Sequence, residues 1–155
     1  MDGPTTLRRR SADGKLLLHI VARGKIGRSP ESELVERYLK RISWPTKLTE
    51  LPDTGRAPPS LPSSSVSILL DERGSALSST ELAHMLEGWR DGGKREARFS
   101  IGAADGHSDA ERTKADLLLS FGPATWPHLL VRAMLAEQLF RATSIVARHP
   151  YHREG

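Results

Sequence analysis

The chain has 155 residues, a net charge of +4 and no cysteine. This is the length of one ordinary domain with a core of its own. The lack of cysteine excludes disulfide bonds and thiolate metal sites, and no apolar run approaches the roughly 20 residues of a membrane helix. The mildly basic charge is compatible with binding to nucleic acid, although the surface of any soluble protein gives a similar value. Arg8–Arg10 are not followed by the apolar stretch of a signal peptide, so we expect a cytoplasmic protein without membrane association.

Two segments are predicted to lie outside the regular structure. Residues 1–14 are polar and contain glycine, proline and arginine, which is typical of a flexible terminal tail. Residues 52–65, PDTGRAPPSLPSSS, are rich in proline and serine and predict a surface loop. Too little chain precedes this loop to bury a separate core, so we expect residues 15–155 to form a single domain.

The rest of the chain alternates between short apolar runs and amphipathic segments. Strands are predicted at residues 15–22, 47–51, 66–71, 96–101 and 117–121. Ser29-Pro30-Glu31 is a helix start, and the sequences that begin at Ser78 and at Ser108 have the pattern of a capping box. Glu72–Gly74 are predicted to turn the chain. The alternation predicts an α/β fold with a mostly parallel sheet and helices on both faces.

The longest predicted helix occupies residues 128–147, which contain neither glycine nor proline. Apolar side chains recur at helical spacing on more than one face, so this helix should be largely buried. Pro127 suits the start of the helix, and Pro150 is expected to stop it. Glu137 and Arg141 are four residues apart, in the order that favours an ion pair.

Three predicted loops follow strands, at residues 70–74, 102–106 and 121–127. In open α/β sheets, ligands bind beyond the carboxyl ends of the strands. Small and turn-forming residues also let backbone groups approach a ligand closely. One such loop is more often only a turn, but three of them at strand ends favour a binding site. The glycine-containing sequence GAADG is not a dinucleotide fingerprint, and the chain contains no P-loop.

The segment after the long helix is dense in hydrogen-bond donors and aromatic surface. It contains His149, Tyr151, His152 and Arg153. No nucleophile elbow accompanies these histidines, and two histidines without cysteine or a nearby acidic pair do not make a metal site that we would predict. His128, at a helix start, is expected to cap or pack. Trp126 is expected to belong to the core or to a lid, and stacking on a nucleobase is the alternative.

Motifs along the chain also resemble those of a known family. LLDERG, FSIGAADG, LLLSFGPATWPH and HPYHRE occur in this order. From residue 16 to residue 154 the chain resembles the SPOUT-class methyltransferases that modify N3 of a pseudouridine in large-subunit ribosomal RNA. The resemblance implies a SPOUT fold with a deep C-terminal trefoil knot. It also implies S-adenosylmethionine as cofactor, and a homodimer that acts on ribosomal RNA or the ribosome.

The resemblance further implies which residues form the site. Those expected to bind the cofactor are Leu70, Gly102, Ala103, Gly122, Pro123, Ala124, Thr125, Trp126 and Pro127. Those expected at the reactive centre are Tyr151, His152 and Arg153, with His152 as the hypothetical base and Arg153 stabilising negative charge. Those expected to contact RNA are Arg23, Lys25, Arg28, His128 and His149.

The chain departs from the family pattern at two places. Ala103 and His107 stand where the family usually has glycine and an apolar residue, and the methyl group of Ala103 would crowd a closely approaching cofactor. The proline-rich residues 52–65 stand where the family usually has a helix between the second and third strands. The alternative function is therefore a catalytically weak or inactive SPOUT-fold module that binds RNA or the ribosome. A flavodoxin-like or nucleotide-binding domain is a further alternative, which no phosphate motif supports.

Overall fold

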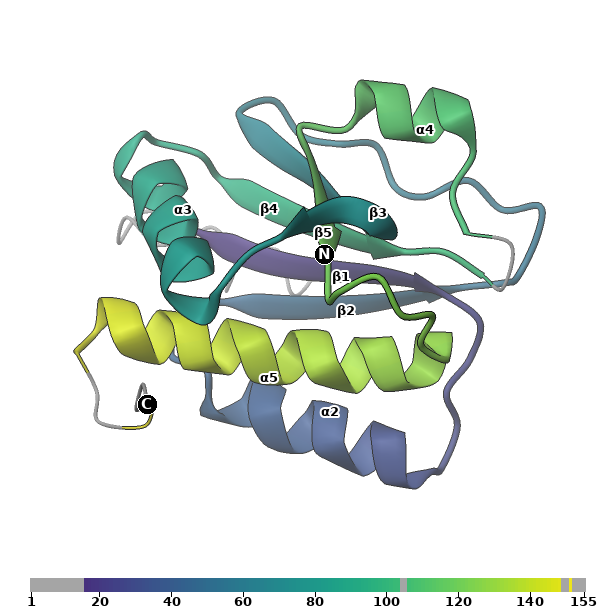
Figure 1. Ribbon diagram of the computed structural model, residues 1–155, viewed down its shortest axis with the longest axis horizontal. Helices are drawn as coiled ribbons and strands as arrows, with labels where there is room; N and C mark the ends of the chain where they lie inside the picture. The colour runs from purple at the N-terminus through teal and green to yellow at the C-terminus, as the bar shows by residue number, and fades with distance from the viewer. Residues whose placement is uncertain (1–15, 104–105, 149–150, 152–155) are drawn as a thin grey trace, which may run out of the picture.

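The computed structural model describes residues 16–103, 106–148 and 151. One sheet of five parallel strands has the order β2-β1-β4-β3-β5 (Figure 1). The strands are β1 (Leu17–Arg23), β2 (Thr46–Leu51), β3 (Ser65–Ala76), β4 (Glu96–Ile101) and β5 (Leu117–Ser120). The helices are α2 (Pro30–Arg41), α3 (Ser79–Asp91), α4 (Asp109–Lys114) and α5 (His128–Val146). The predicted α/β class is confirmed, and every strand pair is parallel. The predicted tail of residues 1–14 lies outside the described residues, so the division into tail and domain stays a prediction.

The apolar core lies between one face of the sheet and the helices α2, α3 and α5. Helix α5 packs against both α2 and α3, while α4 lies on the opposite side of the sheet (Figure 1). Ile20 and Phe99 of the sheet are fully buried, as are Leu135 and Leu139 of α5. The helix α5 is therefore the largely buried element that its sequence predicts.

The second face of the sheet carries a buried polar cluster. The Nδ1 atom of His19 lies 2.8 Å from Oε2 of Glu96, and its Nε2 atom lies 2.8 Å from the hydroxyl of Thr49. Arg98 donates to Glu96 at 3.1 Å and to the carbonyl groups of Pro59 and Ser60 at 2.5 and 3.1 Å. Residues 52–64 form no helix. Arg98 of β4 instead holds the proline-rich segment against the sheet through these two hydrogen bonds.

The local signals in the sequence predicted the helix starts correctly. Ser29 caps α2, and both predicted capping boxes are present, at Ser78 and at Ser108. The predicted ion pair within α5 also forms, since Arg141 donates to Glu137 at 2.6 Å. Each of these contacts joins residues that are close in the sequence, which is why their spacing alone could indicate them.

One predicted boundary was wrong, and the end of α5 agrees with its prediction to within one residue. Glu72–Gly74 do not turn the chain out of the sheet, because β3 continues to Ala76 and pairs with β5 beyond a register shift between Leu70 and Ser75. The helix α5 ends at Val146, before Pro150 is reached. There Arg148 adopts a φ of 59° and its N–H donates to the carbonyl of Ile145, so a left-handed residue ends the helix.

The buried carboxylate of Glu96 predicts how stability depends on pH. Burial alone would raise the pKa of Glu96, but the hydrogen bond from His19 and the charges of His19 and Arg98 outweigh burial and hold this pKa below its ordinary value of 4.5. As the pH falls, the unfolded chain therefore binds the proton first. The stability that Glu96 contributes is present above pH 4.5 and is lost as the pH falls through the folded-state pKa.

We expect the variant Glu96→Gln to lose this part of the acid dependence. Urea unfolding between about pH 7 and pH 3 measures it as the change in the free energy of unfolding. Glu87→Gln is the control, because the Glu87 side chain is 46% exposed in its ion pair with Arg90. Equal acid dependence in the wild type and the Glu96 variant would contradict the prediction.

Candidate functional site

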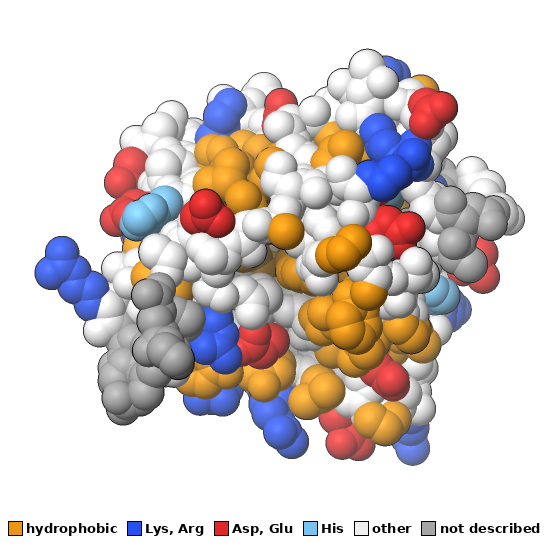
Figure 2. All heavy atoms as spheres, viewed as in Figure 1, with side chains coloured by type: hydrophobic (Ala, Val, Ile, Leu, Met, Phe, Trp, Pro, Cys, Tyr) orange, Lys and Arg blue, Asp and Glu red, His pale blue; other side chains and the backbone are white. Residues whose placement is uncertain are grey.

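A cavity of about 830 Å³ lies at the carboxyl ends of β4 and β5, beside residues 70–73 within β3, and reaches the first turn of α5. All three loops that the sequence singled out contribute to its wall. The predicted cofactor residues that line it are Leu70, Gly102, Ala103, Gly122, Ala124, Thr125, Trp126 and Pro127. The lining residues do not include Pro123, although it lies in the same loop. Figure 2 shows apolar side chains gathered on the surface over the start of α5 and the loop before it. The structure thus brings together the residues that the sequence predicted for one ligand.

The loop after β4 forms one wall through its backbone. A Cβ atom on Gly102 would lie 2.9 Å from the carbonyl oxygen of Gly106, so a glycine is required at this position. The amide of Gly106 donates to the carbonyl of Ala103 at 2.8 Å, and Gly106 has a φ of 75°. These contacts form a tight bend whose backbone faces the cavity.

The loop that leads to α5 is joined to the extension of β3. The hydroxyl of Ser120 donates to the carbonyl of Glu72 at 3.2 Å, and the hydroxyl of Thr125 donates to the carboxylate of Glu72 at 2.8 Å. Trp126 is 43% exposed, and its indole N–H donates to the carbonyl of Phe121 at 3.3 Å. Of the two expectations for Trp126, a place in the core was wrong because Trp126 is exposed, whereas its position in the cavity wall is compatible with a lid.

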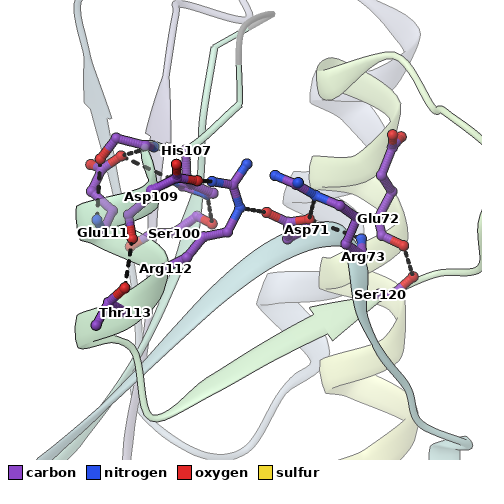
Figure 3. Close-up of polar contacts among 11 residues, drawn as sticks. Asp71, Glu72, Arg73, Ser100, His107, Asp109, Glu111, Arg112, Thr113 and Ser120 are labelled. Carbon is purple, nitrogen blue, oxygen red and sulfur yellow. Dashed lines mark hydrogen bonds and ion pairs between the residues drawn. The ribbon is translucent and has the colours of Figure 1, made fainter.

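A polar wall that sequence analysis missed closes the side of the cavity towards α4 (Figure 3). The buried carboxylate of Asp71 accepts from Arg112 at 2.7 Å, and Arg112 also donates to Asp109 at 2.7 Å. The side chain of His107 is 6% exposed; its Nε2 donates to the carbonyl of Ser100 at 3.1 Å. The pair of Arg112 and Asp71 ties α4 to the end of β3. The partners are 41 residues apart, so spacing gave no signal for this pair.

The structure places the residues predicted to contact RNA in different surroundings. Lys25 and Arg28 are exposed, and His128 lines the cavity. Arg23 is only partly exposed and donates to the carbonyls of Pro52 and Arg56 at 3.1 and 2.5 Å, so it anchors the proline-rich segment. Its expected contact with RNA stays untested. His149 lies outside the described residues.

Of the three residues predicted for the reactive centre, the structure describes Tyr151. Its ring packs on Phe140 with 4.5 Å between the ring centroids, and its hydroxyl donates to Glu137 at 3.0 Å. Tyr151 therefore lies beside the C-terminal half of α5, whereas the cavity adjoins the first turn. The 19 residues of α5 span about 28 Å. The structure does not bring Tyr151 to the cavity of its own chain. His152 and Arg153 lie outside the described residues.

Burial and the hydrogen bond to Glu137 raise the pKa of Tyr151 from 10.0 to about 12. At neutral pH the phenol is therefore a hydrogen-bond donor and does not accept a proton from a substrate.

The described residues contain neither a metal site nor a membrane-spanning helix. No group of three histidine, cysteine, aspartate or glutamate side chains gathers there in a way that could hold a metal ion. In the same part of the chain, no helix has the length and apolar character needed to span a membrane.

The parallel sheet and the cavity at its edge define an α/β protein whose cavity has the position and size typical of a site for a small organic ligand. Comparisons with known proteins narrow this class. The family model described as "Predicted SPOUT methyltransferase" matches residues 16–152. The chain belongs to this family, so it is a methyltransferase whose cofactor is S-adenosylmethionine.

Several curated relatives are similar over nearly their whole length. These relatives are named "Ribosomal RNA large subunit methyltransferase H", and two of them show the degree of similarity. The one from Sphingopyxis alaskensis is 65% identical over 140 residues, which cover 90% of this chain and 99% of the relative. The one from Erythrobacter litoralis is 66% identical over 140 residues, which cover 90% and 100%.

A solved structure shows the same fold. The probable methyltransferase from Bordetella pertussis Tohama I matches with a TM-score of 0.53 and 12% identity, over 88% of this chain and 99% of that one.

The close approach at Gly102 gives a test of the cavity. We expect Gly102→Ala to push the bend apart, because the new Cβ would meet the carbonyl of Gly106. If the overpacking of about 1–3 kcal/mol is lost from binding, the affinity for S-adenosylmethionine is weaker by about 5- to 150-fold. Calorimetric titration with S-adenosylmethionine measures this. Gly88→Ala is the control, because a Cβ on Gly88 of α3 has open space. Unchanged affinity in the Gly102 variant would show that the cavity is not the cofactor site.

The raised pKa of Tyr151 gives a second test. The chain has two tyrosines, so in the variant Tyr38→Phe the ultraviolet absorbance reports Tyr151 alone. We expect the folded protein to ionise at about pH 12. The hydrogen bond from the Tyr151 hydroxyl to Glu137 stabilises the folded state fully below pH 10.0. This stabilisation is lost as the pH rises through about 12. Adding Glu137→Gln should lower the transition towards 10.0. A transition near pH 10.0 before that addition would contradict the observed hydrogen bond.

Proposed function

We propose that this protein transfers a methyl group from S-adenosylmethionine to N3 of a pseudouridine in large-subunit ribosomal RNA, in the cytoplasm. The observation that carries the proposal is the meeting of the three strand-end bends in one cavity. The names of the curated relatives support ribosomal RNA as substrate. The HPYHRE ending supports the pseudouridine, through its resemblance to the enzymes that modify this position.

The residues present suit the cofactor. The cavity of about 830 Å³ has the size expected for a ligand of this kind. Backbone groups of Gly102 and Ala103 and of the loop 122–127 would hold the polar parts, and Leu70 and Val131 supply apolar surface. When bound, S-adenosylmethionine supplies an electrophilic methyl group on a sulfonium. Ala103 lies in the cavity wall, so its methyl group narrows the site without filling it.

The substrate nitrogen is an imide and becomes a nucleophile when its proton leaves. In the proposed mechanism His152 takes this proton, because a histidine has its ordinary pKa close to neutral pH. Arg153 would stabilise the negative charge that develops on the base. Tyr151, with its pKa near 12, would position the segment by donating to Glu137.

The placement of Tyr151 favours a homodimer. Tyr151 is held at Glu137 and Phe140, about 9 to 14 Å along α5 from Val131, which lines the cavity of its own chain. A second copy in the opposite direction along α5 would bring its segment 149–154 to this cavity. In a two-fold dimer the same contact then completes both sites.

The contact between β3 and β5 favours the expected trefoil knot. A Cβ on Gly74 would lie 2.5 Å from the backbone of Leu118, so the extension of β3 is pressed directly against β5. Passage of α5 through the loop that this extension closes would make the knot and would fix the cofactor bends.

The proposal is tested with ribosomes from cells that lack the gene. We expect the purified protein and S-adenosylmethionine to add one methyl group to a pseudouridine of the large-subunit RNA, located by mass spectrometry of nuclease fragments. With His152→Ala we expect kcat to fall by about 100-fold or more and the rise of the rate near the histidine pKa to disappear.

His84→Ala is the matched control, because His84 is an exposed residue of α3 away from the cavity. An unchanged pH profile in the His152 variant would remove His152 as the base. Cofactor binding without methylation would instead indicate the alternative, an inactive module that binds RNA.

A further inference from the structure

We infer that Arg132 is a positioning residue that holds the basic loop 23–28 beside the cofactor cavity. Arg132 lies one turn into α5 and is completely buried. Its Nη1 donates to the carboxylate of Glu50 at the end of β2, and its Nη2 donates to the carbonyl of Gly24 at 3.0 Å. One guanidinium thus links α5 both to β2 and to the loop after β1.

Glu50 completes the link from the other side. Its Oε2 also accepts from the backbone amide of Ile26 at 3.1 Å. The loop is therefore held at two backbone points, the carbonyl of Gly24 and the amide of Ile26, by the two members of one ion pair. A third contact, from the amide of Gly24 to the carbonyl of Leu51 at 2.7 Å, fixes where the loop begins.

The loop that is held in this way adjoins the cavity. A Cβ on Gly24 would lie 3.1 Å from Oδ1 of Asp53 and 3.8 Å from Nε2 of His128. His128 lines the cavity, and so does Val131, the residue before Arg132. Gly24 has a φ of 91°, which suits glycine and lets the loop bend towards α5.

The arrangement is poorly explained by stability alone. The Nε atom of Arg132 is buried and has no hydrogen-bond partner within the described part of the chain. A buried N–H without a partner is destabilising, and the carboxylate that pairs with Arg132 belongs to a side chain that is itself 29% exposed. The pair does give the loop a defined geometry, and Lys25 and Arg28 are exposed on this loop.

This inference rests on the proposed function, in which Lys25 and Arg28 contact the phosphates of RNA. A preorganised loop presents both cations together and loses little conformational entropy on binding. If the link is broken, the cations remain but their positions spread. RNA binding should then weaken while the cofactor cavity, whose wall does not contain Glu50 or Arg132, stays intact.

The test is Glu50→Gln, which keeps the size of the side chain but removes its charge. We expect KM for RNA to rise about 10-fold with kcat and the Kd for S-adenosylmethionine changed by less than about 2-fold. The slope of log Kd for RNA against log salt should fall by about 2, one for each cation. Hydrogen exchange at Ile26 should become faster. Arg132→Lys, which cannot make both bonds from one planar group, should behave in the same way.

The control is Glu96→Gln, the same chemical change in another buried ion pair, at the start of β4 and away from the loop. It should lower stability and leave the salt slope unchanged. Equal salt slopes in the wild type and the Glu50 variant would overturn the inference. So would wild-type RNA binding by Lys25→Ala/Arg28→Ala, because the loop would then not contact RNA. The Kd for RNA and its salt slope, unlike KM and kcat, are measured without turnover, so a failure of methylation in the wild type would count against the proposed function and not against this inference.

Discussion

The backbone contact between the extension of β3 and β5 is the constraint on which the site depends. At Gly74 a side chain would meet the backbone of Leu118 at 2.5 Å, so the two segments can approach only because this residue is glycine. Pairing then resumes as Ser75 meets Leu119 beyond the register shift. The intervening residues are displaced towards the cavity, as bulged residues commonly are. That displacement puts Glu72 within reach of the loop that precedes α5.

Much of the fold could be predicted because its signals are local. A serine followed three residues later by glutamate satisfies the first amides of a helix wherever it occurs, and both such boxes formed. Apolar runs between polar turns gave the strand ends to within five residues, and both ends of β4 without any difference. The cavity also followed from the sequence, because the carboxyl ends of parallel strands share one edge of a sheet. The three predicted segments became neighbours because β4, β3 and β5 are adjacent in the sheet, an order that the sequence did not show.

The features that sequence analysis missed depend on residues far apart in the chain. Arg132 is a charged residue in a mostly apolar helix sequence, which is typical of a position that faces solvent. In the structure it is completely buried. Its counter-charge comes from Glu50, 82 residues away. The pair of Arg112 and Asp71 joins segments whose proximity exists only after β3 and β4 have paired. Gly74 has the appearance of a turn for the same reason, because nothing near it in the sequence shows that β5 will lie against it.

Successive parts of helix α5 make different contacts of the site. Its first turn, with His128 and Val131, closes the cavity, and Arg132 in the next turn reaches the basic loop. Further along, Glu137 holds the phenol of Tyr151. A buried helix keeps these groups at fixed separations, so the cavity and the phenol of Tyr151 in one chain stay apart. The proposed reaction needs the methyl donor in the cavity and His152 at the same pseudouridine. Two copies related by a two-fold axis meet this need without any new element, because each helix then carries its end segment to the other's cavity. The rigidity that separates the two halves of the site within one chain is therefore the physical argument for a second chain.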